Sequence, residues 1–164
     1  MKKTILVATL AMMAGAMSHA QLRISDNAIG LRGGGGDGFG TEISYQRFLG
    51  GDSNRLEATL GFESGENFDG FKVAGIYQWM WNIEGDFNWY AGPGGGLAVS
   101  SYDGRNDDRD DDSESALFVA GQIGIEYNFG VPIVISLDYR PEFYLGNFRD
   151  ELESTFALGI RYQF

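Results

Sequence analysis

The chain has 164 residues and a formal net charge of −11, from 23 acidic and 12 basic residues. So acidic a chain is a poor candidate for a nucleic-acid-binding protein. It contains no cysteine, which excludes disulfides and thiolate metal sites. Its abundant glycine and aromatic residues favour an all-β membrane barrel over a helical globule.

The first 20 residues have the organisation of a secretory signal peptide. Two lysines precede an apolar stretch from Ile5 to Met17, and Ser18-His19-Ala20 forms a small-x-small cleavage site. The apolar stretch is too short to be a spanning helix. We therefore expect export through the general secretory pathway and cleavage before Gln21. The remaining residues, 21–164, are enough for one barrel domain and hold 10 basic against 23 acidic residues.

Eight segments follow, each apolar on one parity and polar or small on the other, as in the strands of a membrane barrel. In chain order, the apolar positions are Ile29 and Leu31; Phe39, Ile43 and Tyr45; Leu56, Ala58, Leu60 and Phe62; Phe71, Val73, Tyr77, Trp79 and Trp81; Phe87, Trp89, Leu97 and Val99; Leu117, Val119, Ile123, Ile125, Tyr127 and Phe129; Ile133, Ile135, Leu137, Tyr139 and Phe143; and Phe156, Leu158, Ile160, Tyr162 and Phe164. The pattern predicts an all-β fold, an eight-stranded antiparallel up-and-down transmembrane β-barrel with this parity facing lipid. A soluble sandwich or secreted ligand-binding barrel, with the apolar parity inward, is the alternative. Arg47 falls on the apolar parity, at a strand end from which its side chain can snorkel to the interface.

The links between segments alternate in length. Links 49–53, 83–86 and 130–131 are short, whereas 63–69, 101–114 and 145–151 are longer; the first, 34–38, is tight. This predicts short periplasmic turns and longer extracellular loops. An aromatic girdle is expected near the periplasmic side, from Trp79, Trp81, Trp89, Tyr127, Phe129, Tyr162 and Phe164.

Two prolines conflict with a closed barrel, which has no edge strand to accept them. We expect a bulge or bend at Pro93 and a place near the rim for Pro141.

The interior of an eight-stranded barrel is just wide enough for side chains to fill. Ten charged residues point there on the polar parity: Arg32, Arg55, Glu57, Lys72, Glu126, Asp138, Arg140, Glu142, Glu153 and Arg161. Buried charges persist only when they are paired, so we predict a salt-bridged, plugged lumen. A small channel for ions or small molecules, lined by the same charges, is the alternative. Gly92, Gly94 and Gly96 also lie on the lumen parity, where they would make room for long Arg and Glu side chains or leave a small cavity.

Catalytic chemistry has little support in the sequence. The only histidine, His19, belongs to the predicted signal peptide, so Ser–His and Cys–His catalysis are unavailable beyond it. We expect no enzyme activity and no cofactor.

The acidic loop 103–114 is a weak candidate for divalent cations, through Asp103, Asp107, Asp108, Asp110, Asp111, Asp112 and Glu114. It does not match the calcium loop of an EF-hand, because Arg105 occupies a ligand position and Asp108 stands where glycine is needed. A solvated surface loop is the alternative.

The last eight residues resemble the C-terminal assembly signal of bacterial outer-membrane barrels. Gly159, Tyr162 and Phe164 occupy its three characteristic places, while Ala157 stands where the family usually has a polar residue. Over essentially all of 21–164, the chain resembles the small eight-stranded barrels of the OmpX and OmpA-transmembrane kind.

The resemblance implies a monomeric, integral outer-membrane protein of Gram-negative bacteria with a structural, protective or surface-interaction role. Its partners would be outer-membrane lipid and, through the last strand, the barrel-assembly machinery. Because the resemblance is architectural, it carries over no specific activity.

Overall fold

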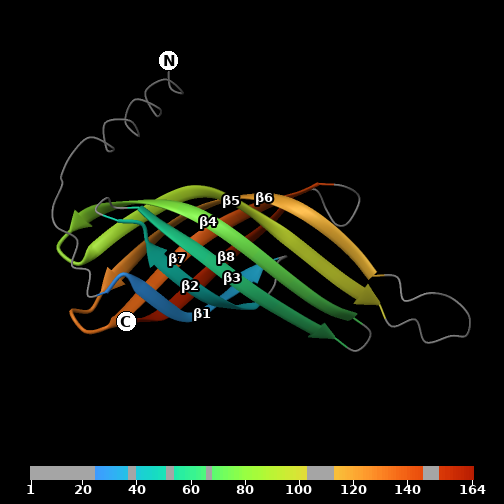
Figure 1. The fold of residues 1–164 in the computed structure, drawn as a ribbon, viewed down its shortest axis with the longest axis horizontal. Helices are drawn as coiled ribbons and strands as arrows, with labels where there is room; N and C mark the ends of the chain where they lie inside the picture. The colour runs from blue at the N-terminus through green and yellow to red at the C-terminus, as the bar shows by residue number, and fades with distance from the viewer. Residues whose placement is uncertain (1–24, 37–39, 51–53, 66–67, 103–112, 146–151) are drawn as a thin grey trace, which may run out of the picture.

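The computed structural model describes residues 25–36, 40–50, 54–65, 68–102, 113–145 and 152–164. They form eight strands: β1 (Asn27–Gly36), β2 (Thr41–Phe48), β3 (Asn54–Gly65), β4 (Phe68–Glu84), β5 (Phe87–Tyr102), β6 (Ser113–Asn128), β7 (Ile133–Leu145) and β8 (Leu152–Gln163). Each strand pairs with the next, and β8 pairs antiparallel with β1, so the sheet closes into a barrel (Figure 1). The predicted fold is confirmed. The predicted signal peptide and Phe39 lie outside the described residues.

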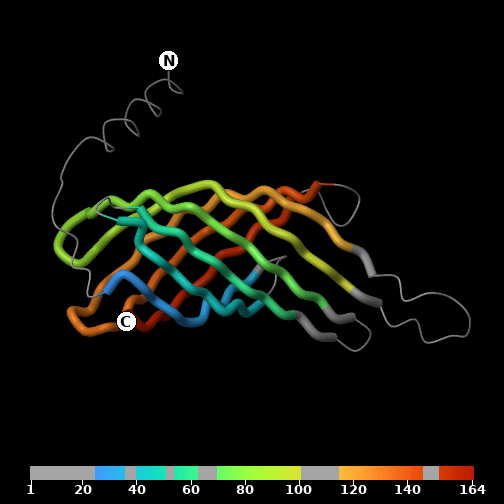
Figure 2. Tube along the Cα trace, viewed as in Figure 1, coloured from blue at the N-terminus to red at the C-terminus, as the bar shows by residue number. Residues whose placement is uncertain are grey.

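The closing seam brings the first and last strands side by side, as the Cα trace in Figure 2 shows. The ladder runs from Ala28 opposite Gln163 to Gly36 opposite Thr155. A Cβ atom at Gly30 would meet the backbone carbonyl oxygen of Ile160, so this close approach of β1 to β8 requires glycine. The amide of Phe164 donates to the carbonyl of Asn27 at 2.9 Å, which continues the seam past the end of β8.

The two faces of the wall have opposite character. The apolar positions predicted to face outward are exposed or partly exposed wherever they are described, and the alternating polar positions are buried inside. On β6, for example, the side chain of Ile123 is 51% exposed and that of its neighbour Gln122 only 4%. Arg47 points outward and is exposed. Outward and inward side chains therefore alternate along the strands with the period of two that the sequence predicted.

One end of the barrel carries both the start of β1 and the end of β8, together with the connections β2–β3, β4–β5 and β6–β7 (Figure 1). We call it the turn end. Gly85 and Gly130, in the turns after β4 and β6, have φ angles of 53° and 67°, which favour glycine.

The predicted girdle residues lie on the strand segments next to the turn end, where their rings contact one another. Trp81 stacks on Trp89 with centroids 4.3 Å apart, and Tyr127 lies 4.6 Å from Phe87 and 4.7 Å from Phe129.

The predicted link 63–69 is wrong. β3 continues to Gly65 and β4 starts at Phe68, with ladder pairs up to Gly65 opposite Phe68. In the sequence, the outward apolar positions end at Phe62 and Phe71. The ladder beyond them therefore has no alternating pattern from which these strand ends could be predicted.

The bulge expected at Pro93 is also misplaced. The β4–β5 register is the same on both sides of Pro93 and shifts between Asn82 and Glu84 instead. Pro93 points outward from an unbroken β5, and the ladder omits two pairs here, Pro93 with Tyr77 and Gly92 with Gln78. Because proline lacks the N–H group, a ladder hydrogen bond is lost there without any change of register. Pro141 lies in β7 opposite Ser154, two residues before the last pair of the β7–β8 ladder, Phe143 opposite Leu152.

Candidate functional site: the charged lumen

All ten charged residues predicted to face the lumen are buried inside the barrel, each with at most 4% of its surface exposed. Glu42 of β2, which is not among the ten predicted residues, is buried with them. Its position on β2 brings a further carboxylate against three cations. The lumen is therefore an ionic core rather than an apolar one.

Glu42 is the first of two carboxylates that organise this core. Its Oε2 accepts from Arg32 Nη1 at 3.1 Å and from Arg140 Nη1 at 2.9 Å, and its Oε1 lies 2.9 Å from Lys72 Nζ. Arg32 also pairs with Asp138 at 2.6 Å, and Lys72 pairs with Glu142 at 3.0 Å. Arg32 and Lys72 thus each have a second carboxylate within about 3 Å.

Glu57 is the second organising carboxylate. Its Oε1 accepts from Arg161 Nη2 and from the Ser44 hydroxyl, both at 2.6 Å, while its Oε2 accepts from Gln78 Nε2 at 2.7 Å. Arg140 Nη2 lies 3.6 Å from the same Oε2. Protein donors thus bind both oxygens of Glu57, as a carboxylate buried in a low-dielectric interior requires.

Several of the ion pairs join strands that are not neighbours in the sheet. Arg32 on β1 meets Asp138 on β7, Arg55 on β3 meets Glu126 on β6 at 2.8 Å, and Arg161 on β8 meets Glu57 on β3. Arg55 and Glu57 both bond to Gln78, which links the Arg55–Glu126 pair to the rest. The contacts therefore cross the lumen and tie opposite walls together.

Two apolar clusters contact this ionic core, and sequence reasoning missed both. Phe48, Met80 and Tyr90 form one; the other contains Ala74, Ala98, Ala116, Phe118 and Tyr144. The Arg55 guanidinium lies 5.5 Å from the Phe48 ring centre and 5.1 Å from that of Tyr90, and Lys72 Nζ lies 5.9 Å from that of Phe118. These are cation–π distances, so the aromatic side chains of both clusters pack against the cations of the ionic core.

The lumen-facing glycines of β5 lie against the backbone of β4 and, at two positions, against apolar side chains. Added Cβ atoms at Gly92, Gly94 and Gly96 would meet backbone carbonyls of β4, and those at Gly94 and Gly96 would also meet Ile76 and Phe118. These glycines allow β5 to approach β4 closely and make room for apolar side chains.

Gly159 serves the ionic core directly. A Cβ there would lie 2.5 Å from both Arg161 Nη1 and Ser136 Oγ, so a side chain would displace the Arg161 guanidinium. Tyr162 faces outward between Ile29 of β1 and Ile133 of β7.

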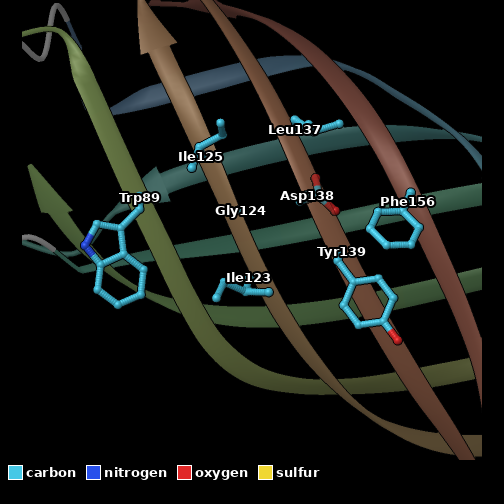
Figure 3. A pocket seen from close by; sticks show the side chains of 8 residues that line it. All are labelled: Trp89, Ile123, Gly124, Ile125, Leu137, Asp138, Tyr139 and Phe156. Carbon is cyan, nitrogen blue, oxygen red and sulfur yellow. The ribbon is translucent and has the colours of Figure 1, made fainter. Parts of the chain in front are cut away.

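A shallow hollow of about 250 Å³ lies on the outer wall and is shown in Figure 3. Trp89, Ile123, Ile125, Leu137, Tyr139 and Phe156 line it from four neighbouring strands, with Gly124 and Asp138 between them. Asp138 belongs to the lumen, where it pairs with Arg32. The hollow is thus a feature of the predominantly apolar outer surface.

The candidate metal ligands at 103–112 lie outside the described residues, as does the side chain of Glu114. Elsewhere in the described strands and turns, no three His, Cys, Asp or Glu side chains gather as a metal site would require. No helix long and apolar enough to cross a membrane occurs in the part of the chain that the structure describes.

Comparison with solved structures finds this architecture in known proteins. Neisserial surface protein A (NspA) matches with a TM-score of 0.59 and 14% identity, over 84% of this chain and 94% of that one. The N-terminal β-barrel domain of Pseudomonas aeruginosa OprF matches with a TM-score of 0.59 and 18% identity, over 85% and 98%. The chain has the fold of the eight-stranded outer-membrane barrels.

A third match is Ail, the attachment invasion locus protein of Yersinia pestis, in complex with the heparin analogue sucrose octasulfate. Its TM-score is 0.52 at 17% identity, over 84% of this chain and 96% of that one. No protein-family model and no curated protein sequence matches the chain. At these identities the likeness concerns the fold.

Proposed function

We propose that this protein is an integral outer-membrane barrel of a Gram-negative bacterium, with a structural, protective or surface-interaction role and a closed lumen. The observation that carries the proposal is the inverted distribution of polarity. Arg32, Arg55, Arg140 and Arg161 are among the largest fully buried side chains, while Leu158 and Phe156 are 59% and 64% exposed. A soluble ligand-binding barrel needs the opposite arrangement, because exposed apolar patches of this extent are rare in soluble monomers.

The closed lumen is supported by how its cations are held. Every basic side chain described inside the barrel has a carboxylate within 4.0 Å, and aromatic side chains pack against the ionic core. Ion movement along the axis would have to break these pairs or displace those rings. A plugged lumen suits a protein that acts through its position in the membrane and its exposed surface.

A small channel is the second candidate, and one observation favours it. Arg55 Nη2, Gln122 Nε2 and Arg140 Nε are buried and have no hydrogen-bond partner among the described residues. Buried donors of this kind are commonly satisfied by internal water. A chain of such waters would give the lumen a hydrated path past the ion pairs.

Single-channel recording in planar bilayers separates the two candidates. We expect the reconstituted wild-type barrel to give no stable unitary conductance. Reproducible unitary steps would favour the channel. Cell fractionation tests the membrane location itself: recovery in the aqueous phase would contradict both candidates and favour the soluble barrel.

Enzyme activity is not part of the proposal, since the chain beyond the predicted signal has neither histidine nor cysteine to act as a base or thiol nucleophile. The barrel-assembly machinery remains a proposed partner of β8, and divalent cations a proposed ligand of loop 103–114.

A further inference from the structure

One basic residue of the described chain does not belong to the lumen. Six arginines and lysines are described: Arg32, Arg47, Arg55, Lys72, Arg140 and Arg161. Five are buried and paired with carboxylates. Arg47 points outward from β2, is exposed, and forms no ion pair or hydrogen bond with another described side chain. It is an isolated positive charge on the outer wall of an acidic protein.

A second donor stands directly opposite Arg47. In the β1–β2 ladder, Arg47 is the partner of Asn27. The Tyr45 hydroxyl donates to Asn27 Oδ1 at 2.7 Å, which leaves the amide Nδ2 of Asn27 as a donor for another acceptor. Two residues with side-chain donors, Arg47 and Asn27, are therefore ladder partners on the outer wall, and Asn27 Oδ1 is already hydrogen-bonded.

The depth of this pair follows from the register. Arg47 lies opposite Leu56, which lies opposite Tyr77. The adjacent row toward the turn end contains Trp79, a girdle residue, opposite Asn54. Aromatic girdles mark the boundary between hydrocarbon and headgroups. The Arg47 guanidinium thus lies at the headgroup level of the leaflet that surrounds the turn end.

Beside this pair, toward the middle of the barrel, two positions of the outer wall have a small side chain or none. The next outward row contains Tyr45, Ala58 and Gly75. Ala58 and Gly75 are exposed, and a Cβ at Gly75 would meet no atom within 4 Å. The polar pair therefore adjoins an open strip of wall that leaves room for a hydrocarbon chain.

We propose that Arg47 and Asn27 bind the phosphate of a phospholipid in the leaflet at the turn end, with an acyl chain over Ala58 and Gly75. The planar guanidinium fits two phosphate oxygens, and the Asn27 amide supplies a further donor. Phosphate is the anion that a membrane offers at this depth. The inference rests on the membrane location proposed above.

The test uses the barrel 21–164 folded in non-ionic maltoside micelles, with dihexanoyl phosphatidylglycerol as the probe. Binding is followed by the NMR shifts of the Asn27 Nδ2 and Arg47 Nε groups. The variants are Arg47→Gln and, as a matched control, Thr41→Gln, which places the same side chain on the same outward face at the other end of β2. Neither position has a buried partner, so both variants should fold.

We expect saturable shifts at both groups in the wild type and in Thr41→Gln, and about fivefold weaker binding in Arg47→Gln, the size of one arginine's attraction near an anionic surface. Equal binding by Arg47→Gln would overturn the proposal. Equal binding of dihexanoyl glycerol, which lacks phosphate, would show that only the apolar wall is recognised. Equal binding of inorganic phosphate would replace the lipid with a free anion.

The control for the membrane location is independent. A wild-type barrel that stays folded and soluble after the detergent is removed would contradict the proposed function. A barrel that needs the micelle but shows no lipid shifts would contradict the lipid site alone.

Discussion

Neutralising Glu57 should destabilise the barrel more than neutralising Glu42, although Glu42 has more ion pairs. In Glu42→Gln, Arg32 keeps Asp138 and Lys72 keeps Glu142, both within about 3 Å. In Glu57→Gln, Arg161 loses the only carboxylate within 4.0 Å among the described residues. Arg161 is 1% exposed, so its charge would stay buried and uncompensated.

Removing one partner of a buried ion pair costs about 3–5 kcal/mol, because the other charge is left without compensation. We place Glu57→Gln near the upper end, at about 5 kcal/mol, and Glu42→Gln at about 3 kcal/mol or less. The double variant Glu57→Gln/Arg161→Met removes both charges. It should recover more than half of the loss, since replacing both members of a buried pair with uncharged groups is often close to neutral.

The assay is urea unfolding in lipid vesicles, followed by tryptophan fluorescence and by the gel mobility of the folded barrel. The three variants are compared with the wild type under conditions where refolding is reversible. A free energy of unfolding that falls more in Glu42→Gln than in Glu57→Gln, or that does not recover in the double variant, would refute the argument that a second carboxylate compensates the cations around Glu42.

Three further predictions concern the wall, the last strand and the acidic loop. Ile123→Arg places a charge toward lipid, at a cost of about 2–4 kcal/mol near mid-membrane. It should impair membrane assembly in cells more than Gln122→Arg, which places the charge in the lumen. Equal assembly of the two variants would show that the two faces are assigned wrongly. Deleting Phe164 should reduce outer-membrane levels in cells, whereas refolding in detergent still succeeds; normal levels in cells would count against an assembly role. Loop 103–114 should bind Ca²⁺ or Mg²⁺ weakly, with Kd on the order of 10⁻⁴–10⁻³ M, seen as NMR shifts of loop amides; no shifts up to several millimolar Ca²⁺ would leave a solvated surface loop.

The period of two in the sequence was enough to predict the fold and the inward direction of each lumen charge. Arg32, Asp138 and Arg161 could be assigned to the interior because alternate residues of a strand point to the same face of the sheet. Their pairing could not be predicted. Arg161 meets Glu57 only because the stagger of the closed sheet sets which residues of opposite walls share a level.

The apolar part of the plug was missed for a related reason. Phe118 and Tyr144 stand on the lumen parity, but a sequence reading that expects polar residues there treats them as exceptions. Their rings lie 5.2 Å apart on the neighbouring strands β6 and β7, where the two residues are ladder partners. The small residues Ala74, Ala98 and Ala116 around them were the available signal, since they leave space for large rings on facing strands.

The ion pair between Arg161 on β8 and Glu57 on β3 has a consequence for the lifetime of the folded protein. These two strands share no ladder, because β1 and β2 lie between them. Their side chains can meet only across a lumen whose circumference is complete. A contact made after closure is absent from every earlier transition state, so it slows unfolding without speeding folding. Such ion pairs do not accelerate the folding of the barrel, but they slow its unfolding.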